Sequence, residues 1–168
     1  MLTISFDNNP TGAIAVVEFN PSESPRVELL ITMPTISVGK NVYIDETTIF
    51  NLINKYKKEN ENILVAFEIG QRQPLFGTKG NFANGFSYGV IRTLVRLSEL
   101  PHIEVNPKTW QKEIFKDIRG ADMSTKEASI EYCKRRFPNE TLLPTPRCSK
   151  KHDGLADALC IASYAARL

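Results

Sequence analysis

The chain has 168 residues, a length that fits a single domain spanning 1–168, and its 42% hydrophobic and 24% charged residues are near the averages for globular proteins. Its longest apolar stretches, such as 63–67, are too short to cross a bilayer, so we expect neither membrane insertion nor secretion. Three cysteines without C-x-x-C spacing favour a reducing compartment, and we expect a cytoplasmic protein.

Basic residues are concentrated late in the sequence. The formal net charge is only +2, but residues 108–152 carry 11 basic and 6 acidic side chains. An ordinary solvated helix surface explains any single lysine in this segment. The segment as a whole favours contact with a polyanion.

Three strands are predicted at the start of the chain. Residues 2–6 and 13–19 are mainly apolar, and a turn rich in asparagine, proline and glycine separates them, which is typical of a hairpin. A third strand is predicted at 27–33, whereas 34–41 is predicted to be irregular. We therefore expect three antiparallel strands to open the fold.

A helix and a central strand follow. The helix is predicted at 47–60 from the spacing of its apolar residues, with Asp45 or Thr47 as its N-cap. The strand at 63–69 is apolar on both alternating faces, as expected of a strand covered on each side. It therefore belongs in the middle of the sheet.

The later elements are mostly helical. In chain order they are a loop at 70–80, a helix at 84–99, a strand at 102–105, and helices at 107–115, 124–137 and 153–168. Pro107 suits a first helical turn, and Ser124 with Glu127 forms a capping-box pattern. The whole order predicts an α/β fold with a mixed sheet, three antiparallel strands followed by parallel strands, flanked by helices.

Four acidic residues lie at the ends of these elements. Asp7 ends the first apolar segment, Glu68 ends the central strand, and Asp153 and Asp157 open the terminal helix. Because the ends of regular elements can meet at one edge of a sheet, we expect the four side chains to converge. Clustered carboxylates raise one another's pKa values unless cations neutralise them, so convergence implies bound metal.

Each acid also has a simpler explanation. Asp7 is a common residue type at the start of a tight turn, and the helix macrodipole explains Asp153 as a helix cap. Glu68 is harder to explain, because an ionised carboxylate in an apolar strand costs several kcal/mol unless it is paired or bound to metal. Asp157 shares a helix face with Asp153, where like charges oppose helix formation. A metal ion bound by both is the sharper interpretation.

The ligand types indicate which metal to expect. Two divalent ions roughly 3.5–4 Å apart can activate a water beside a phosphodiester and stabilise the leaving oxygen, with carboxylates between and around them. Carboxylate oxygens suit Mg²⁺, for which Mn²⁺ can substitute. Cys148 and His152 offer a zinc alternative, but no obvious thiolate partners accompany them. The residues therefore favour phosphate-ester chemistry with two Mg²⁺ ions.

Several motifs are similar to those of a known family. The most specific are Ile4-Ser5-Phe6-Asp7, Val65-Ala66-Phe67-Glu68 and Lys151-His152-Asp153-Gly154-Leu155-Ala156-Asp157-Ala158-Leu159. Together with 106–110 and 124–129, they make the chain resemble the RuvC family of Holliday-junction resolvases, particularly its shorter phage and poxvirus-like members, within the RNase H-like superfamily. Asp153 and Asp157 are four residues apart, as in mitochondrial-type members of the family.

The resemblance implies a fold, an activity and an assembly. The fold is expected to be RNase H-like, and the family's catalytic metal ligands fall on Asp7, Glu68, Asp153 and Asp157. The implied activity is Mg²⁺-dependent hydrolysis of branched DNA, above all four-way junctions, without a nucleotide cofactor. A junction with near two-fold symmetry implies a homodimer, with helix 84–99 as an interface candidate whose apolar face fits the core equally well. For a phage protein, the location would be the host cytoplasm.

Basic and aromatic residues outside the acidic set are candidates for DNA contact. They are Arg72, Phe76, Lys79, Phe82, Lys126, Lys150, Lys151 and His152. Basic groups can hold phosphates, while an exposed aromatic ring can stack on an unpaired base at a branch point. Solvated loops and aromatic rings packed on the domain are the alternatives.

Three functions remain open at this point. The first is a structure-selective endonuclease that resolves Holliday junctions or other branched DNA. The second is a catalytically silent protein that binds branched DNA, and the third is an RNase H-like nuclease acting on RNA–DNA hybrids. All four acids are present in the sequence, which favours an active nuclease over a silent binding protein.

Overall fold

The computed structural model describes residues 1–72, 74, 77–118 and 122–168. Its strands are β1 (Leu2–Asp7), β2 (Ala13–Glu18), β3 (Arg26–Thr32), β4 (Thr35–Val38), β5 (Asn41–Ile44), β6 (Ile63–Glu68) and β7 (His102–Val105). Its helices are α1 (Glu46–Glu59), α2 (Gly77–Leu97), α3 (Pro107–Ile114), α4 (Thr125–Arg136) and α5 (Asp153–Ala165). Within these described ranges, no helix has both the length and the apolar character needed to span a membrane.

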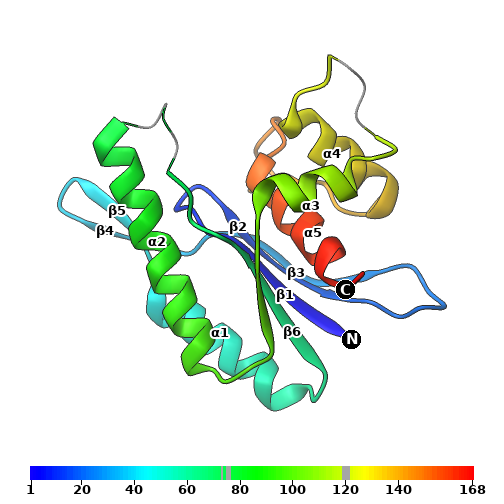
Figure 1. Cartoon of the computed structure of the whole chain (residues 1–168), viewed down its shortest axis with the longest axis horizontal. Coiled ribbons are helices and arrows are strands. Elements are labelled where there is room, and N and C mark those ends of the chain that lie inside the picture. Colours follow the sequence, from blue (N-terminus) through cyan, green and yellow to red (C-terminus); the bar gives the residue numbers. More distant parts are fainter. Residues whose placement is uncertain (73, 75–76, 119–121) are drawn as a thin grey trace.

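Five strands form a mixed sheet at the centre of the fold (Figure 1). Their order is β3-β2-β1-β6-β7, with β2 antiparallel to both β1 and β3, and with β6 parallel to both β1 and β7. The predicted mixed sheet, with antiparallel strands followed by parallel ones, is confirmed. Phe6 lies beside Phe67 in the β1–β6 register, so Asp7 and Glu68 end neighbouring strands at the same edge.

Helices cover both faces of this sheet (Figure 1). One core lies between the sheet and helices α1 and α2, and it contains Ile4 and Phe6 of β1. The other core lies between the sheet and helices α3, α4 and α5. Ser5 faces this second core, because side chains alternate along a strand, and its hydroxyl donates a 2.8 Å hydrogen bond to the carbonyl oxygen of Ala158 on α5. Small side chains at this contact let α5 pack closely on β1.

The predicted helix starts are largely confirmed. Asp45 is the N-cap of α1, and its side chain accepts a hydrogen bond from the backbone N–H of Thr48. The Ser124–Glu127 capping box is present at the start of α4. Pro107 occupies the first turn of α3, which removes a backbone N–H that would otherwise lack a partner there.

Two local predictions are wrong. Residues predicted to be irregular form the β4–β5 hairpin, a separate two-stranded sheet whose turn contains Gly39 with φ of 61°. The segment was hard to interpret because all four residues of β4 are exposed, so no buried face marks it as a strand. Helix α2 begins at Gly77 and not at residue 84, despite glycines that disfavour a helix. Lys79 and Phe82 therefore lie on a helix and not in a loop.

Candidate active site

Asp7 and Glu68 lie side by side at the carboxyl ends of β1 and β6. Both share the sheet face that packs on α5, because Asp7 is two residues after Ser5 and Glu68 is two residues after Ala66 of that core. Both acidic residues are partly buried. The parallel pairing of two strands therefore places two carboxylates together at one end of the sheet.

The start of α5 reaches the same end of the sheet because two glycines meet there. A Cβ atom added to Gly154 would lie 2.9 Å from the Cα atom of Gly12. A Cβ atom added to Gly12 would lie 2.1 Å from the carbonyl oxygen of Asp7. Neither position leaves room for a side chain, so the β1–β2 turn and α5 touch through their backbones. This contact places Asp153 beside the turn that follows Asp7.

Helix α5 carries its two acids one turn apart. His152 is the N-cap and Asp153 is the first helical residue, so Asp153 is not the cap, although it lies in the first turn, where the helix macrodipole favours an acid. Asp153 forms an ion pair with Lys126 of α4. Burial raises the pKa of Asp153, but the hydrogen bond and charge of Lys126 outweigh burial and leave that pKa below its ordinary value.

Asp7 lies in the electric field of the other three carboxylates. Burial raises the pKa of Asp7 well above its ordinary value, and the negative charges of Asp157, Glu68 and Asp153 raise it further. A hydrogen bond of 3.4 Å from the side-chain amide of Asn9 offsets this only in part. The four acids named from the sequence therefore interact with one another in the folded chain.

Two of the acids receive hydrogen bonds from buried neutral groups. Burial raises the pKa of Glu68 to about 7, although the indole N–H of Trp110 donates to its Oε1 atom over 2.6 Å and lowers the pKa. Burial likewise raises the pKa of Asp157 to about 6, although the hydroxyl of Ser129 donates to its Oδ1 atom. Such shifts occur where several acids share a site of low polarity.

The ammonium group of Lys126 already lies among these acids. The pKa of Lys126 is raised by its hydrogen bond and charge interaction with Asp153, and further by the charges of Asp157 and Asp7. In the part of the chain that the structure describes, no three Asp, Glu, His or Cys side chains stand in an arrangement that could hold a metal ion. The four carboxylates lie at one end of the sheet, but each contacts a different residue of the protein. These contacts are Asp7 with Asn9, Glu68 with Trp110, Asp153 with Lys126, and Asp157 with Ser129.

The other predicted DNA contacts fall into two groups. Lys150, Lys151 and His152 directly precede α5 and its acids, and Lys126 joins them through its ion pair. Arg72 and Lys79 are exposed and flank the start of α2. Phe82, on α2, is 68% exposed, whereas Phe76 lies outside the described residues.

Sequence reasoning missed the aromatic neighbours of Phe82. Phe86 stacks on Phe82 with ring centroids 6.3 Å apart, and Tyr43 of the β4–β5 hairpin meets Phe86 edge to face at 5.5 Å. Lys40 and Lys79 lie in the same shallow hollow of about 310 Å³. The four-residue spacing of Phe82 and Phe86 was a readable signal for one helix face, but only after the helix start had been placed correctly.

Sequence reasoning also missed Trp110 and Ser129. Both residues are completely buried, and they contact Glu68 and Asp157 through single side-chain hydrogen bonds. Helical spacing predicts that Trp110 and Ile114 share the buried face of α3, which indicates a core residue and no more. Their contacts with the acids depend on how α3 and α4 pack, which local sequence patterns do not reveal.

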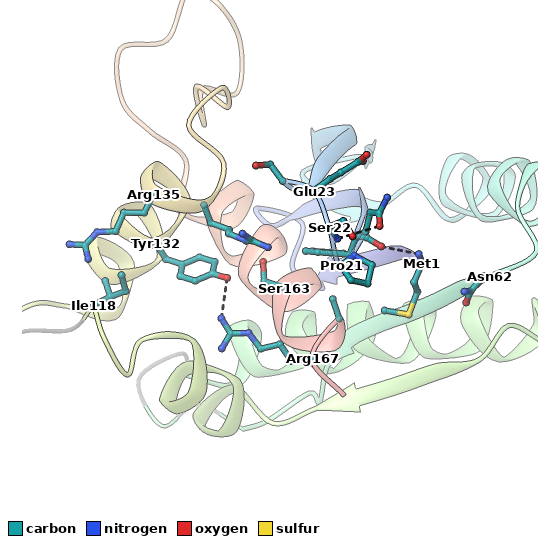
Figure 2. Close-up of a pocket in the computed structure, with 15 residues that line it drawn as sticks. Met1, Pro21, Ser22, Glu23, Asn62, Ile118, Tyr132, Arg135, Ser163 and Arg167 are labelled. Atoms are coloured by element: carbon teal, nitrogen blue, oxygen red, sulfur yellow. Dashed lines mark hydrogen bonds between the residues drawn. The ribbon is translucent and has the colours of Figure 1, made fainter.

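A larger hollow of about 1150 Å³ lies elsewhere, near the opposite end of β1 (Figure 2). Arg135 and Arg167 line it, but each forms an ion pair, with Glu131 and Glu113 respectively. Figure 2 also shows Arg167 donating to the hydroxyl of Tyr132, at 3.4 Å. Because the C-terminal ends of α4 and α5 both border this hollow, their dipoles oppose an anionic ligand. The acidic end of the sheet is therefore the stronger candidate site.

Comparisons with known proteins bear on the fold. A scan of protein-family models and a search of curated protein sequences each found no match. Among solved structures, T. thermophilus RuvC in complex with a Holliday junction substrate matches with a TM-score of 0.61 and 16% identity, over 99% of this chain and 93% of that chain. A second T. thermophilus RuvC structure matches with a TM-score of 0.58 and 19% identity, over 99% and 96%.

A eukaryotic protein is similar as well. The yeast mitochondrial Holliday junction resolvase Ydc2 matches with a TM-score of 0.65 and 13% identity, over 98% of this chain and 77% of that chain. All three alignments span nearly the whole of this chain. The chain therefore has the RuvC fold that its sequence motifs predict.

Proposed function

We propose that this chain is a metal-dependent endonuclease that resolves four-way DNA junctions. The observation that carries the proposal is the meeting of Asp7, Glu68, Asp153 and Asp157 at one end of the sheet, from three distant segments of the chain. The RuvC fold supports it, because one protein with that fold is known in complex with a Holliday junction substrate. The phage-like branch and the homodimer inferred from the sequence remain predictions.

The four carboxylates fit divalent cations in chemistry and in charge. All four offer hard oxygen ligands, which suit Mg²⁺ or Mn²⁺. Burial is the main cause of the raised pKa of Asp7, and the repulsion from the other three acids, which adds to it, is relieved when a cation binds among them. Asp7 is central, because the charges of the other three all act on it, so it would hold the metal together with Glu68, Asp153 and Asp157. Metal binding requires Asp153 to leave its ion pair with Lys126.

Two bound ions would activate a water molecule and stabilise the leaving oxygen of the phosphodiester. The chain's own residues hold the substrate for that reaction. Lys126, once free of Asp153, can pair with a phosphate oxygen beside the acids. Lys150, Lys151 and His152 extend the positive surface along the segment that leads into α5. No residue of the chain forms a covalent intermediate in this scheme.

The start of α2 supplies a second contact with branched DNA. Phe82 presents an exposed ring that can stack on an unpaired base, while Arg72 and Lys79 hold nearby phosphates. Phe86 stacks on this ring, and Tyr43 packs in turn against Phe86. These contacts keep the ring of Phe82 projecting from the surface. We assign junction recognition to this aromatic group and phosphodiester hydrolysis to the acidic end of the sheet.

A single carboxylate substitution tests the proposal. Asp153→Asn should abolish Mg²⁺-dependent cleavage of a labelled four-way junction, while the affinity for the junction measured in Ca²⁺ or in chelator stays within about threefold of the wild type, since the phosphate contacts remain. Asp117→Asn is the matched control, because Asp117 is exposed and belongs to none of the elements that carry the four acids. Cleavage by Asp153→Asn at the wild-type rate would refute the site.

The same assay separates the other two functions. A silent binding protein would bind the junction without cutting it in either Mg²⁺ or Mn²⁺. An enzyme acting on RNA–DNA hybrids would cut a labelled hybrid faster than a junction of equal length. We expect wild-type protein to cut the junction and to leave the hybrid and the plain duplex largely intact.

A further inference from the structure

Two of the four carboxylates are held by buried donors that carry no charge. The indole N–H of Trp110 donates to Oε1 of Glu68 over 2.6 Å, and the hydroxyl of Ser129 donates to Oδ1 of Asp157. Trp110 and Ser129 are both fully buried, on α3 and α4 respectively. The packing of its helix therefore fixes each side chain in place, and the hydroxyl of Ser129, which also lies 3.1 Å from the carbonyl oxygen of Thr125, has that carbonyl as its one other acceptor among the described residues.

A neutral donor acts on a carboxylate differently from a lysine. The ammonium of Lys126 neutralises Asp153 and competes with any cation for it. Trp110 and Ser129 each engage one carboxylate oxygen and add no positive charge, so the second oxygen stays available to a cation without electrostatic competition. Groups that hydrogen-bond to a metal ligand fix its orientation, and their loss lowers metal affinity by roughly 10- to 100-fold.

The local structure explains why these two donors reach the acids. Strand β7 lies next to β6, and α3 begins two residues after β7 ends, so its first turns lie beside the end of β6 where Glu68 is located. The Asn106 side chain caps α3 and fixes where the helix begins. Ser129 lies in the second turn of α4, which packs along α5 and its Asp157.

We propose that Trp110 and Ser129 are positioning residues of the metal centre, which hold Glu68 and Asp157 so that one oxygen of each is free for a divalent cation. This inference depends on the proposed function, because it requires that the four acids bind metal. Neither residue touches the substrate. Their role is to keep two ligands in place before the metal arrives.

The competing explanation is that both residues serve packing alone. Trp110 belongs to the core under α5 and meets the ring of Phe115 edge to face at 5.4 Å. A packing role predicts that any comparable disturbance of this core weakens the protein and leaves metal affinity unchanged. A positioning role predicts that only the loss of the donor group lowers metal affinity.

Matched variants separate the two explanations. Trp110→Phe removes the indole N–H and keeps an aromatic ring, while Phe115→Leu disturbs the same ring contact and keeps the N–H. Ser129→Ala removes the hydroxyl near Asp157, while Ser163→Ala removes another buried hydroxyl, one that donates to the carbonyl of Leu159 within α5. Binding of Mn²⁺ is measured directly, by electron paramagnetic resonance of the free ion, with no DNA present.

We expect Trp110→Phe and Ser129→Ala to weaken Mn²⁺ binding by roughly 10- to 100-fold. Phe115→Leu and Ser163→Ala should lower the melting temperature and leave the Mn²⁺ affinity within twofold of the wild type. Wild-type affinity in both Trp110→Phe and Ser129→Ala overturns the positioning role and leaves the proposed function intact. Absence of Mn²⁺ binding by wild-type protein overturns both.

Tryptophan emission gives a second readout. Trp110 is the only tryptophan of the chain, and its indole contacts a proposed ligand directly. Binding of Mn²⁺ should quench its fluorescence in the wild type, and excess Mg²⁺ should restore it by competition. The quenching midpoint should shift to higher Mn²⁺ concentration in Ser129→Ala and stay unchanged in Ser163→Ala. If Mn²⁺ leaves the fluorescence unchanged while the resonance signal reports binding, the ion lies away from Glu68 and the inference is overturned.

Discussion

At the scale of single residues, the raised pKa values of Glu68 and Asp157 make the stability of the metal-free protein depend on pH. The folded pKa values are about 7 and about 6, whereas an unfolded chain has values near 4. Between these limits the folded state binds protons that the unfolded state has released. The free energy of unfolding must therefore fall as pH rises through this window.

Thermal melts in chelator should show this dependence. We expect the metal-free protein to lose on the order of 2 kcal/mol of stability between pH 4.5 and pH 7.5, a figure reduced for the partial exposure of both groups. Saturating Mg²⁺ at pH 7.5 should recover the loss, since the ion binds only the folded state. Glu68→Gln should weaken the pH dependence. A stability that stays constant or rises across this window in chelator contradicts the raised pKa values that burial, and to a lesser extent the neighbouring acids, give Glu68 and Asp157.

At the scale of elements, the contact between α5 and the β1–β2 turn depends on the absence of a side chain at Gly154. Gly154→Ala would place a methyl group 2.9 Å from the Cα atom of Gly12, so the helix must shift away from the turn. We expect a loss of roughly 1–3 kcal/mol in the free energy of unfolding, measured with denaturant, together with weaker Mn²⁺ binding.

A second helical glycine provides the control. Among the residues that the structure describes, none places an atom within 4 Å of a Cβ added to Gly89 of α2, and the backbone conformation there suits any residue. Gly89→Ala should therefore stabilise the protein by roughly 0.4–1 kcal/mol and leave metal binding unchanged. If Gly154→Ala were equally harmless, close packing between α5 and the turn could not be what gathers the acids.

The elements that the sequence predicted well are those whose local signals agree with their packing. The capping box at Ser124 and the apolar run of β6 are examples, since the first marks where α4 begins and the second marks a strand covered on both faces. The β4–β5 hairpin was missed because β4 has no buried face, and the start of α2 was missed because its glycines argue against a helix that tertiary contacts stabilise. Local sequence signals therefore predict an element poorly where tertiary packing determines its structure.

The same distinction between local sequence signals and tertiary packing applies to the residues of the candidate site. The four acids could be named from the sequence because each ends or begins an element whose direction was correctly predicted. Their partners Trp110, Ser129 and Lys126 could not be assigned, since which groups face one another across α3, α4 and α5 depends on the angles at which those helices pack.

At the scale of the whole molecule, the acids proposed for hydrolysis and the aromatic group proposed for junction recognition lie at the same end of the sheet. The acids lie on the α5 side, and Phe82 with Lys79 lies on α2, which covers the opposite face. The end of β1 and the turn that follows it lie between them, because Pro10 lines the hollow beside Phe82 and Gly12 touches α5. A branched substrate placed across this edge can therefore reach both groups at once.

Salt dependence tests whether the positive groups at this edge hold phosphates. The slope of the logarithm of junction affinity against the logarithm of salt concentration becomes shallower by roughly 0.9 for each duplex phosphate that the protein no longer neutralises. Replacing both Lys150 and Lys151 with Gln should therefore reduce the slope by up to about 1.8 and weaken binding at low salt. The affinity for junctions and for plain duplex should decline together, because phosphate contacts carry no information about branching.

The matched control replaces Lys55 and Lys58 with Gln, since both are exposed on α1, on the sheet face away from α5. This pair removes the same charge from the molecule and should leave the slope within experimental error of the wild type. Phe82→Ala should behave in a third way, with an unchanged slope and a selective loss of affinity for the junction relative to the duplex, because stacking on an unpaired base requires a branch point. Equal effects of the two lysine pairs would mean that net charge alone drives binding, and that the edge of the sheet carrying the acids is not where DNA lies.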